Sequence, residues 1–201
     1  MRLRLGEVAT VQQGPSRSGR SAAGRQGQGI VQLVNGSNIQ DDTLRGPFAT
    51  IAIPINKLTE KHLLRPFDVL VTGKSTSAKA ALVGPSLGAA VANSTLLVVR
   101  SDAPEITTFI WWFLTSREGR AAVELRMVAS ATLSFLPPRA LAEMVVPFPG
   151  SDEVRKIFEL VEVSERAYRS AVEAAELRRN ALRNAYVHGL MARSANSGRA
   201  R

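Results

Sequence analysis

The C-terminal part of the chain has the pattern of one long helix, and this feature constrains the fold most. Ser151 is a suitable N-cap, and acidic residues follow it in the first turn. Apolar and small residues then recur at intervals of four and three, or of their sum, the spacing of a coiled-coil seam: Ile157, Val161, Ser164, Tyr168, Ala171, Ala175, Leu182 and Ala185. We therefore predict a helix over residues 151–190, ending near Gly189, and a disordered polar tail over 191–201.

The charges of this helix are segregated along its length. Residues 151–176 carry seven acidic and four basic side chains, whereas residues 177–201 carry six arginines and no acid. Two parallel copies would place like charges together, while two antiparallel copies would set each acidic half against a basic half. Each exposed pair contributes only about 0.3–0.5 kcal/mol, so charge would select the orientation and apolar burial would supply the affinity. We predict a homodimer with an antiparallel coiled coil; the alternative is a helix that folds back on its own domain.

Residues 1–150 have the pattern of a small β-rich domain. The spacing becomes helical over 105–128, where we expect Gly119 to separate two short helices and the core to contain Trp111 and Trp112. A strand, a helical turn and another strand complete the domain. The predicted fold class is α+β, with a short helix pair and one long C-terminal helix. Short runs with two-residue alternation predict antiparallel strands at 30–39, 48–54, 68–73, 79–84 and 93–102.

The charge of the chain is strongly positive, because 26 Lys and Arg stand against 17 Asp and Glu, which gives +9. Such an excess attracts nucleic acids or acidic membrane surfaces, although a soluble basic protein with neither partner also fits it. Cysteine is absent, which excludes disulfides, thiolate nucleophiles and cysteine-based metal sites. No apolar stretch is long enough to cross a bilayer, and the first residues lack the apolar region of a signal peptide. We therefore expect a cytoplasmic protein without a membrane partner.

The segment 68–84, DVLVTGKSTSAKAALVG, has some features of a phosphate-binding P-loop. Such a loop needs a glycine at the position of Asp68, where a carboxylate would repel phosphate, and it must open a long helix. Gly84 and Pro85 leave room for at most two helical turns. We interpret the segment as a β-hairpin whose turn, GKSTSAK, exposes lysines and small hydroxyl groups that can donate to phosphates and base edges. An ordinary solvated turn is the alternative.

Other catalytic patterns are missing or incomplete. His62 and His188 lie far apart in the sequence and lack carboxylates at ligand spacing, so we expect no metal site. No nucleophile-elbow sequence is present, and no acidic residue lies two positions before a lysine, as one nuclease signature requires. The sequence FLPPRA is faintly similar to the Pro-Pro motif of amino-methyltransferases, but Leu136 stands where that motif has Asn or Asp. We predict a chain without catalytic residues.

The order of these segments resembles half of a type I restriction–modification specificity subunit: one target recognition domain followed by one conserved-region helix. The resemblance covers nearly all of residues 1–190. In this chain Phe67 replaces a usual glycine, SDEVRKI stands where the family usually has Glu-Gln, and one domain and one helix replace the usual two. The similar segments are, in order, RLGEVATVQQG, IVQLVNGSNIQDD, LRPFDVLVTGKSTSAKAALVG, NSTLLVVRSD, FIWWFLTSREGRAAV and LPPRALAEMVVPFPG.

The resemblance implies a target recognition domain over 1–150 that reads one half of a bipartite DNA site. It implies a long helix over 151–190 through which two copies rebuild a full subunit. The implied partners are double-stranded DNA, DNA methyltransferase (M) subunits and possibly a restriction (R) subunit. The chain itself would hold no cofactor, because S-adenosylmethionine would bind the methyltransferase subunits, which flip the target adenine.

The candidates for DNA contact are basic and small polar residues in loops. One group lies in the Gly-rich segment 13–29, which has three arginines and no acid and is predicted to be a mobile loop. Three alternatives to this function remain: a DNA-binding accessory or regulatory protein without a methyltransferase partner, a nucleotide-binding enzyme that uses the Gly-Lys-Ser turn, and a plain coiled-coil scaffold. The candidates are Arg17, Arg20, Arg25, Lys74, Ser75, Thr76 and Lys79, with Arg126 and Ser130 as secondary choices.

Overall fold

The fold is α+β, as the sequence predicted, and the chain divides into two compact units. A computed structural model describes residues 1–15, 28–54, 60–129 and 134–197. The N-terminal unit is Met1–Phe158 and the C-terminal unit is Glu159–Arg201. The long helix α6 (Ser151–Ser197) begins at the residue expected from the sequence, and its first two turns belong to the N-terminal unit.

A four-stranded antiparallel sheet forms the centre of the N-terminal unit, in the order β2-β11-β7-β9. The strands are β2 (Thr10–Gln13), β11 (Leu96–Arg100), β7 (Val69–Thr72) and β9 (Ala80–Leu82). The apolar residues 96–99 of β11 are all buried, so both faces of the central strand are covered. This arrangement confirms the strands predicted near 68–73, 79–84 and 93–102.

A second sheet has the order β10-β3-β6, from β10 (Ala90–Ala92), β3 (Gln28–Val34) and β6 (Ala49–Pro54). Strands β3 and β6 are antiparallel, as predicted, but β10, which was not among the predicted strands, is parallel to β3. Parallel neighbours need a long connection. The chain supplies one here, because β6 and the β7–β9 hairpin of the first sheet lie between β3 and β10 along the sequence.

Two helices follow β11: α3 (Pro104–Thr115) and α4 (Arg117–Glu124). They separate at Ser116 and not at Gly119, because the Ser116 hydroxyl oxygen accepts the Gly119 N–H at 3.1 Å and caps α4. A Cβ at Gly119 would lie 1.9 Å from the Phe113 carbonyl oxygen, so glycine serves close packing there. Trp111 is buried as predicted, but Trp112 is 47% exposed, and its expected place in the core is wrong.

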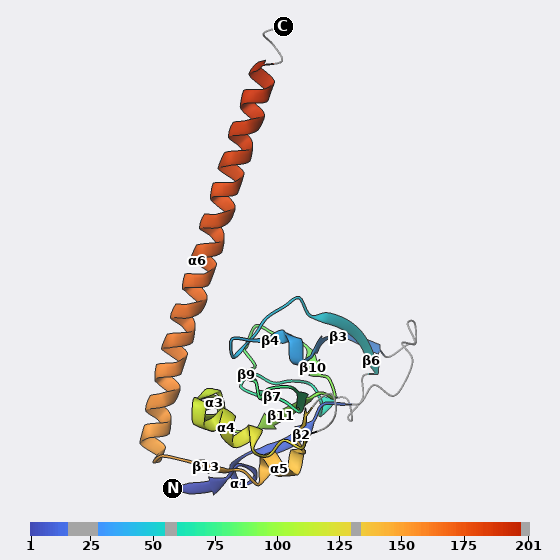
Figure 1. The fold of residues 1–201 in the computed structure, drawn as a ribbon, viewed down its shortest axis with the longest axis vertical. Coiled ribbons are helices and arrows are strands. Elements are labelled where there is room, and N and C mark those ends of the chain that lie inside the picture. The colour runs from blue at the N-terminus through green and yellow to red at the C-terminus, as the bar shows by residue number, and fades with distance from the viewer. Residues whose placement is uncertain (16–27, 55–59, 130–133, 198–201) are drawn as a thin grey trace. The chain divides into compact units, whose positions relative to one another are not determined.

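The two ends of the N-terminal unit lie side by side at its base (Figure 1). Strand β1 (Arg2–Arg4) pairs with β13 (Val145–Pro147), and α1 (Leu5–Val8) packs beside α5 (Pro138–Ala142). The Met1 ammonium donates to the Phe148 carbonyl oxygen at 2.7 Å. The predicted sequence of strand, helical turn and strand before α6 is therefore confirmed.

Phe67 adopts a left-handed conformation, with φ of 68°. It occupies the third position of a turn of type II form, in which Pro66 precedes it and the Asp68 N–H donates to the Arg65 carbonyl oxygen. Glycine is the residue that this position favours, and a phenylalanine there costs about 1–2 kcal/mol of backbone strain. The centres of the Phe67 and Phe158 rings lie 5.9 Å apart, so the strained residue makes an aromatic contact within the N-terminal unit.

Helix α6 continues through Gly189 to Ser197, beyond the end that we expected near residue 189. A glycine inside a helix costs about 1 kcal/mol relative to alanine, and the good helix formers around it, without a proline, outweigh that cost. None of the helices, within the described residues, is both long and apolar enough to cross a membrane.

A buried ion pair connects β7 to the end of β11. The Arg100 guanidinium donates to both oxygens of Asp68, at 2.7 and 2.6 Å, and to the Leu63 carbonyl oxygen at 2.7 Å. The Asp68 side chain is 2% exposed and the Arg100 side chain is 12% exposed. Asp68 also accepts the Arg65 N–H at 2.7 Å. The Asp68 carboxylate, whose position excluded a P-loop in the sequence analysis, thus stabilises the fold.

Asp68→Asn is expected to lower the free energy of unfolding by about 3–5 kcal/mol, because it keeps the side-chain shape but leaves a nearly buried guanidinium without its charge partner. Chemical denaturation measures this loss. The control is Glu143→Gln in the exposed Arg139–Glu143 pair, which should leave the midpoint unchanged. Equal midpoints for wild type and Asp68→Asn would contradict the role given to this pair.

Candidate nucleic-acid interface

The turn between β7 and β9 is the first part of the candidate interface, and it is rigidly held. The buried Thr72 hydroxyl accepts the Lys79 N–H at 3.0 Å and donates to the Ser77 carbonyl oxygen at 3.1 Å. The Thr72 N–H donates to the Lys79 carbonyl oxygen. The segment after Gly73 forms strands and not a helix, so the predicted hairpin is confirmed.

Strand pairing brings a second loop next to this turn. Strand β8 (Lys74–Ser75) pairs with β12 (Ser134–Phe135), and Val128 forms a bridge to Phe135 on its other side. The Lys74 Nζ lies 6.0 Å from the centre of the Phe135 ring. Two segments that the sequence proposed separately for DNA contact are therefore neighbours in the fold.

The described candidates present cations and hydroxyl groups to the surface. Lys74, Thr76 and Lys79 are exposed, and Ser75 is half-buried. Arg126 is half-buried and donates to the Ala122 carbonyl oxygen at 2.7 Å, so part of its hydrogen-bonding capacity is already used. The remaining candidates lie outside the described residues: Arg17, Arg20, Arg25 and Ser130.

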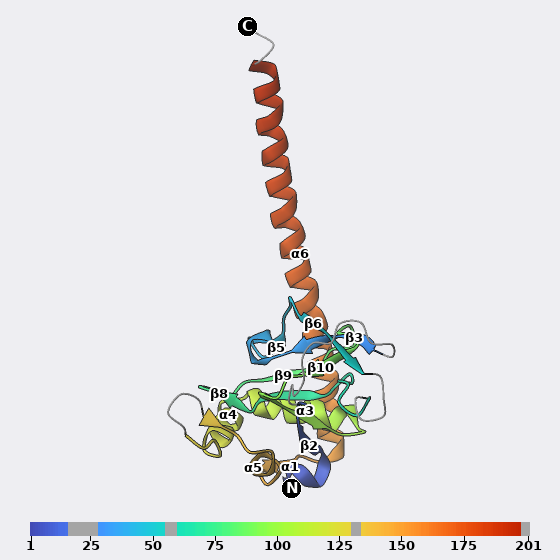
Figure 2. The ribbon, with the colours of Figure 1, turned by 90° about the vertical axis from the view of Figure 1, so that its right-hand side faces the viewer.

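A third element was missed by the sequence analysis. Strands β4 (Ile39–Gln40) and β5 (Thr43–Leu44) form a hairpin with a two-residue turn at Asp41 and Asp42, whose φ angles are 49° and 60°. Two consecutive positive φ values define a type I′ turn, and aspartate is among the few residues that tolerate them. Figure 2 shows β5, β8 and α4 on the same side of the N-terminal unit.

The hairpin borders a hollow of about 650 Å³. The β7–β9 turn contributes Lys79 to the lining of the hollow, and helix α4 contributes Arg120. The hollow combines cationic and anionic side chains, so it suits a ligand that has both hydrogen-bond donors and acceptors. Its lining residues are Ile39, Gln40, Asp41, Asp42, Lys79 and Arg120.

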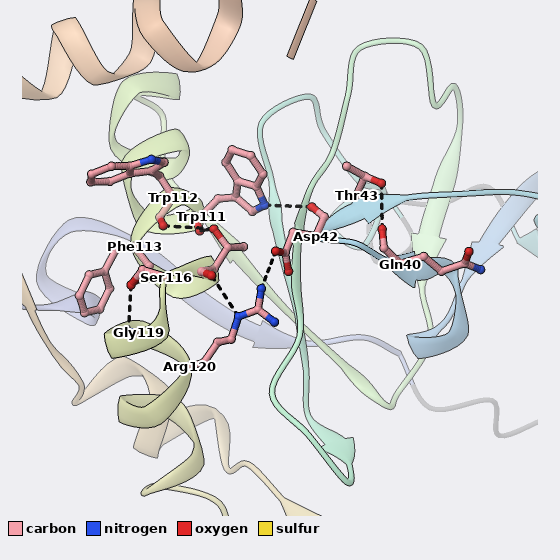
Figure 3. A network of polar contacts seen from close by, with 10 residues as sticks. Gln40, Asp42, Thr43, Trp111, Trp112, Phe113, Ser116, Gly119 and Arg120 are labelled. Atoms are coloured by element: carbon pink, nitrogen blue, oxygen red, sulfur yellow. Dashed lines mark hydrogen bonds and ion pairs between the residues drawn. The ribbon is translucent and has the colours of Figure 1, made fainter. Parts of the chain in front are cut away.

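Asp42 is the residue that fixes the hairpin to the helix pair (Figure 3). The Trp111 Nε1–H donates to the Asp42 carbonyl oxygen at 3.2 Å, and the Arg120 guanidinium donates to the Asp42 carboxylate at 2.5 Å. The Arg120 Nε–H also donates to the Thr115 carbonyl oxygen at 3.0 Å. This network explains the different positions of the two tryptophans, since only the Trp111 indole points toward Asp42.

The residues predicted for helix pairing are distributed along α6. Ile157 is half-buried and Val161 is buried. Ala171, Ala175 and Leu182 are exposed, and Leu182 is 73% exposed; Tyr168 is 43% exposed. Among the described residues, no group of three His, Asp or Glu side chains is arranged to hold a metal ion.

The comparisons agree with the resemblance noted in the sequence. No protein-family model matches the chain, and no curated protein sequence matches it. Solved structures do match. The S subunit of a type I restriction-modification system from M. genitalium gives a TM-score of 0.61 at 13% identity, over 90% of this chain and 42% of that chain.

Two further structures give similar results. A chain of a type I R-M system gives a TM-score of 0.52 at 21% identity, over 89% of this chain and 43% of that one. The HsdS subunit from Thermoanaerobacter tengcongensis gives 0.50 at 19% identity, over 87% and 39%. The chain therefore has the fold of type I specificity subunits, and it spans about two fifths of the length of the chains that it matches.

Thr72→Val is expected to loosen the β7–β9 turn, because it removes the acceptor of the Lys79 N–H and the donor to Ser77. Loss of these bonds should cost about 1–2 kcal/mol locally, which amide hydrogen exchange at Lys79 would report as faster exchange. Thr76→Val, at an exposed position of the same turn, is the control. Unchanged protection of Lys79 in Thr72→Val would contradict this assignment.

Proposed function

We propose that this chain recognises DNA as the specificity subunit of a type I restriction–modification complex. In this proposal the N-terminal unit reads one half of a bipartite site in double-stranded DNA. Methyltransferase subunits that hold S-adenosylmethionine carry out the chemistry, and a restriction subunit can join them. The role of this chain is recognition without catalysis, in the cytoplasm where the DNA lies.

One observation carries the proposal: a turn with two exposed lysines lies beside a second segment that carries a half-buried arginine. The pairing of β8 with β12 brings the Lys74–Lys79 turn next to the segment that contains Arg126. A net charge of +9 adds long-range attraction for the phosphate backbone. Rigid turns that carry lysines and hydroxyl groups suit contacts to phosphates, which fix the register of a protein on the duplex.

The exposed face of α6 supports pairing with a second copy. At 100° per residue, the predicted seam residues Tyr168, Ala171, Ala175 and Leu182 share one face, while Glu162 and Glu173 lie on the opposite face. Tyr168 is 43% exposed and Leu182 is 73% exposed. An antiparallel partner would cover this face and set the acidic half of one helix against the arginines of the other. Two copies would then supply the two recognition units that a bipartite site needs.

The double variant Lys74→Ala with Lys79→Ala is expected to weaken binding of the full chain to duplex DNA by a few kcal/mol, about 2–4, and to reduce the slope of log K against log salt. Loss of two cationic contacts to the duplex, the one from Lys74 being to a phosphate, causes both effects. Fluorescence anisotropy at several salt concentrations measures them.

The control for these lysines is Lys61→Ala with Lys156→Ala, which removes the same charge at exposed positions away from the turn. If both double variants lose the same affinity, net charge explains the loss and the turn is not the site. Unchanged binding in the first variant would remove the turn from the interface.

Leu182→Asp is expected to convert a dimer into a monomer, as is Tyr168→Asp, because a carboxylate would be buried in the apolar seam. Light scattering of the full chain measures the mass. Asn180→Asp adds the same charge on the opposite side of the helix and should leave the dimer intact. A dimer that persists in Leu182→Asp would contradict the predicted seam.

A further inference from the structure

We infer that the hollow between the β4–β5 hairpin, the β7–β9 turn and α4 reads a guanine–cytosine pair in the major groove. Asp41, Lys79 and Arg120 are the side chains that would make the contacts. The inference rests on the proposed function and deepens it, because it names the bases that one part of the interface recognises. None of the sequence motifs assigned a role to Asp41 or Arg120.

The charges of the hollow select this class of ligand over others. A phosphate group would meet the carboxylates of Asp41 and Asp42, and a metal cation would meet Lys79 and Arg120. A G·C pair presents both kinds of group in the major groove: guanine offers the acceptors N7 and O6, and cytosine offers the N4 amino donor. Lys79 and Arg120 can donate to the guanine acceptors while the Asp41 carboxylate accepts from the cytosine amino group.

The hairpin holds Asp41 in a fixed position but leaves it accessible. Ile39 is buried in the core and Leu44 packs against the same core, so both strands of the hairpin are anchored. Asp42 is held by Trp111 and Arg120, as Figure 3 shows. Asp41, the next residue in the turn, has a side chain that is 78% exposed. A reading group needs this combination of a rigid backbone and a free surface.

The existing partners of these side chains leave room for DNA. Asp41 makes an exposed ion pair with Arg45 at 3.1 Å, and exposed pairs of this kind are weak enough to rearrange on binding. Arg120 uses its Nε–H and one Nη2–H for Thr115 and Asp42, and its side chain is 41% exposed. Its remaining N–H groups are the ones assigned to guanine. Lys74, on the far side of the same turn, keeps the role of a phosphate contact.

The test selects binding sequences from random duplex DNA with the full chain. We expect wild type to select a motif with a G·C pair at one position, and Asp41→Asn to lose preference for G·C over A·T there by about 5- to 100-fold. Asparagine tolerates the left-handed turn conformation, so the fold should persist. Lys79→Ala should lose preference at the same position. Asp102→Asn changes another exposed carboxylate, outside the hollow, and should select the wild-type motif.

The outcomes separate this inference from the proposed function. If wild type selects no motif, the proposed function and the inference both fail. If wild type selects a motif and Asp41→Asn selects the same one with unchanged discrimination, only the inference fails. If Lys79→Ala weakens binding to all sequences by the same factor, Lys79 contacts a phosphate. That result would also overturn the assignment of Lys79 to guanine.

Discussion

The N-terminal unit depends on strand β11, because β11 pairs with a neighbouring strand on each edge and bonds to the segment around β7 at each end. At its far end Arg100 forms the buried pair with Asp68. Just before its start, the Thr95 carbonyl oxygen accepts N–H groups from Gly73 and Lys74, at 2.7 and 3.1 Å. The strand therefore fixes β7 at both ends. Since the lysine turn follows β7 directly, its position is set by the core and not by loop contacts alone.

The parts of the fold that depend on local pattern could be predicted from the sequence. The apolar run of β11 and the start of α6 at Ser151 are local signals. The parallel partner β10 could not be predicted in this way, because three residues carry little pattern and their pairing is decided by contacts far along the chain. The break between α3 and α4 was misplaced for a related reason: glycine was interpreted as a breaker, whereas Gly119 fits a close approach to Phe113 and Ser116 provides the cap.

In the candidate site, too, the residues in local features could be predicted from the sequence and those joined by distant contacts could not. The lysines of the β7–β9 turn were found because a hairpin turn is a local feature. The hairpin at Asp41 and Asp42 was missed, although an Asp-Asp pair between Ile39 and Leu44 is compatible with a two-residue turn. Its link to Arg120 spans 78 residues of sequence, so no local pattern could place that guanidinium beside it. The resemblance succeeded because it depended on the order of several degenerate segments along the chain and not on a single motif.

If the hollow faces DNA, as we propose, its carboxylates have a physical use in a chain as basic as this one. A net charge of +9 attracts every duplex equally, so charge alone gives affinity without discrimination. A fixed carboxylate among the cations lowers affinity for all sequences, and only a base that donates a hydrogen bond to it recovers the loss. Asp42 cannot serve this purpose, because Arg120 already neutralises it and its turn position is structural. Asp41 can, since the network around Asp42 holds its backbone while its own side chain faces solvent. Under the proposed function, discrimination in this unit therefore depends on keeping one aspartate of the pair fixed and the other accessible.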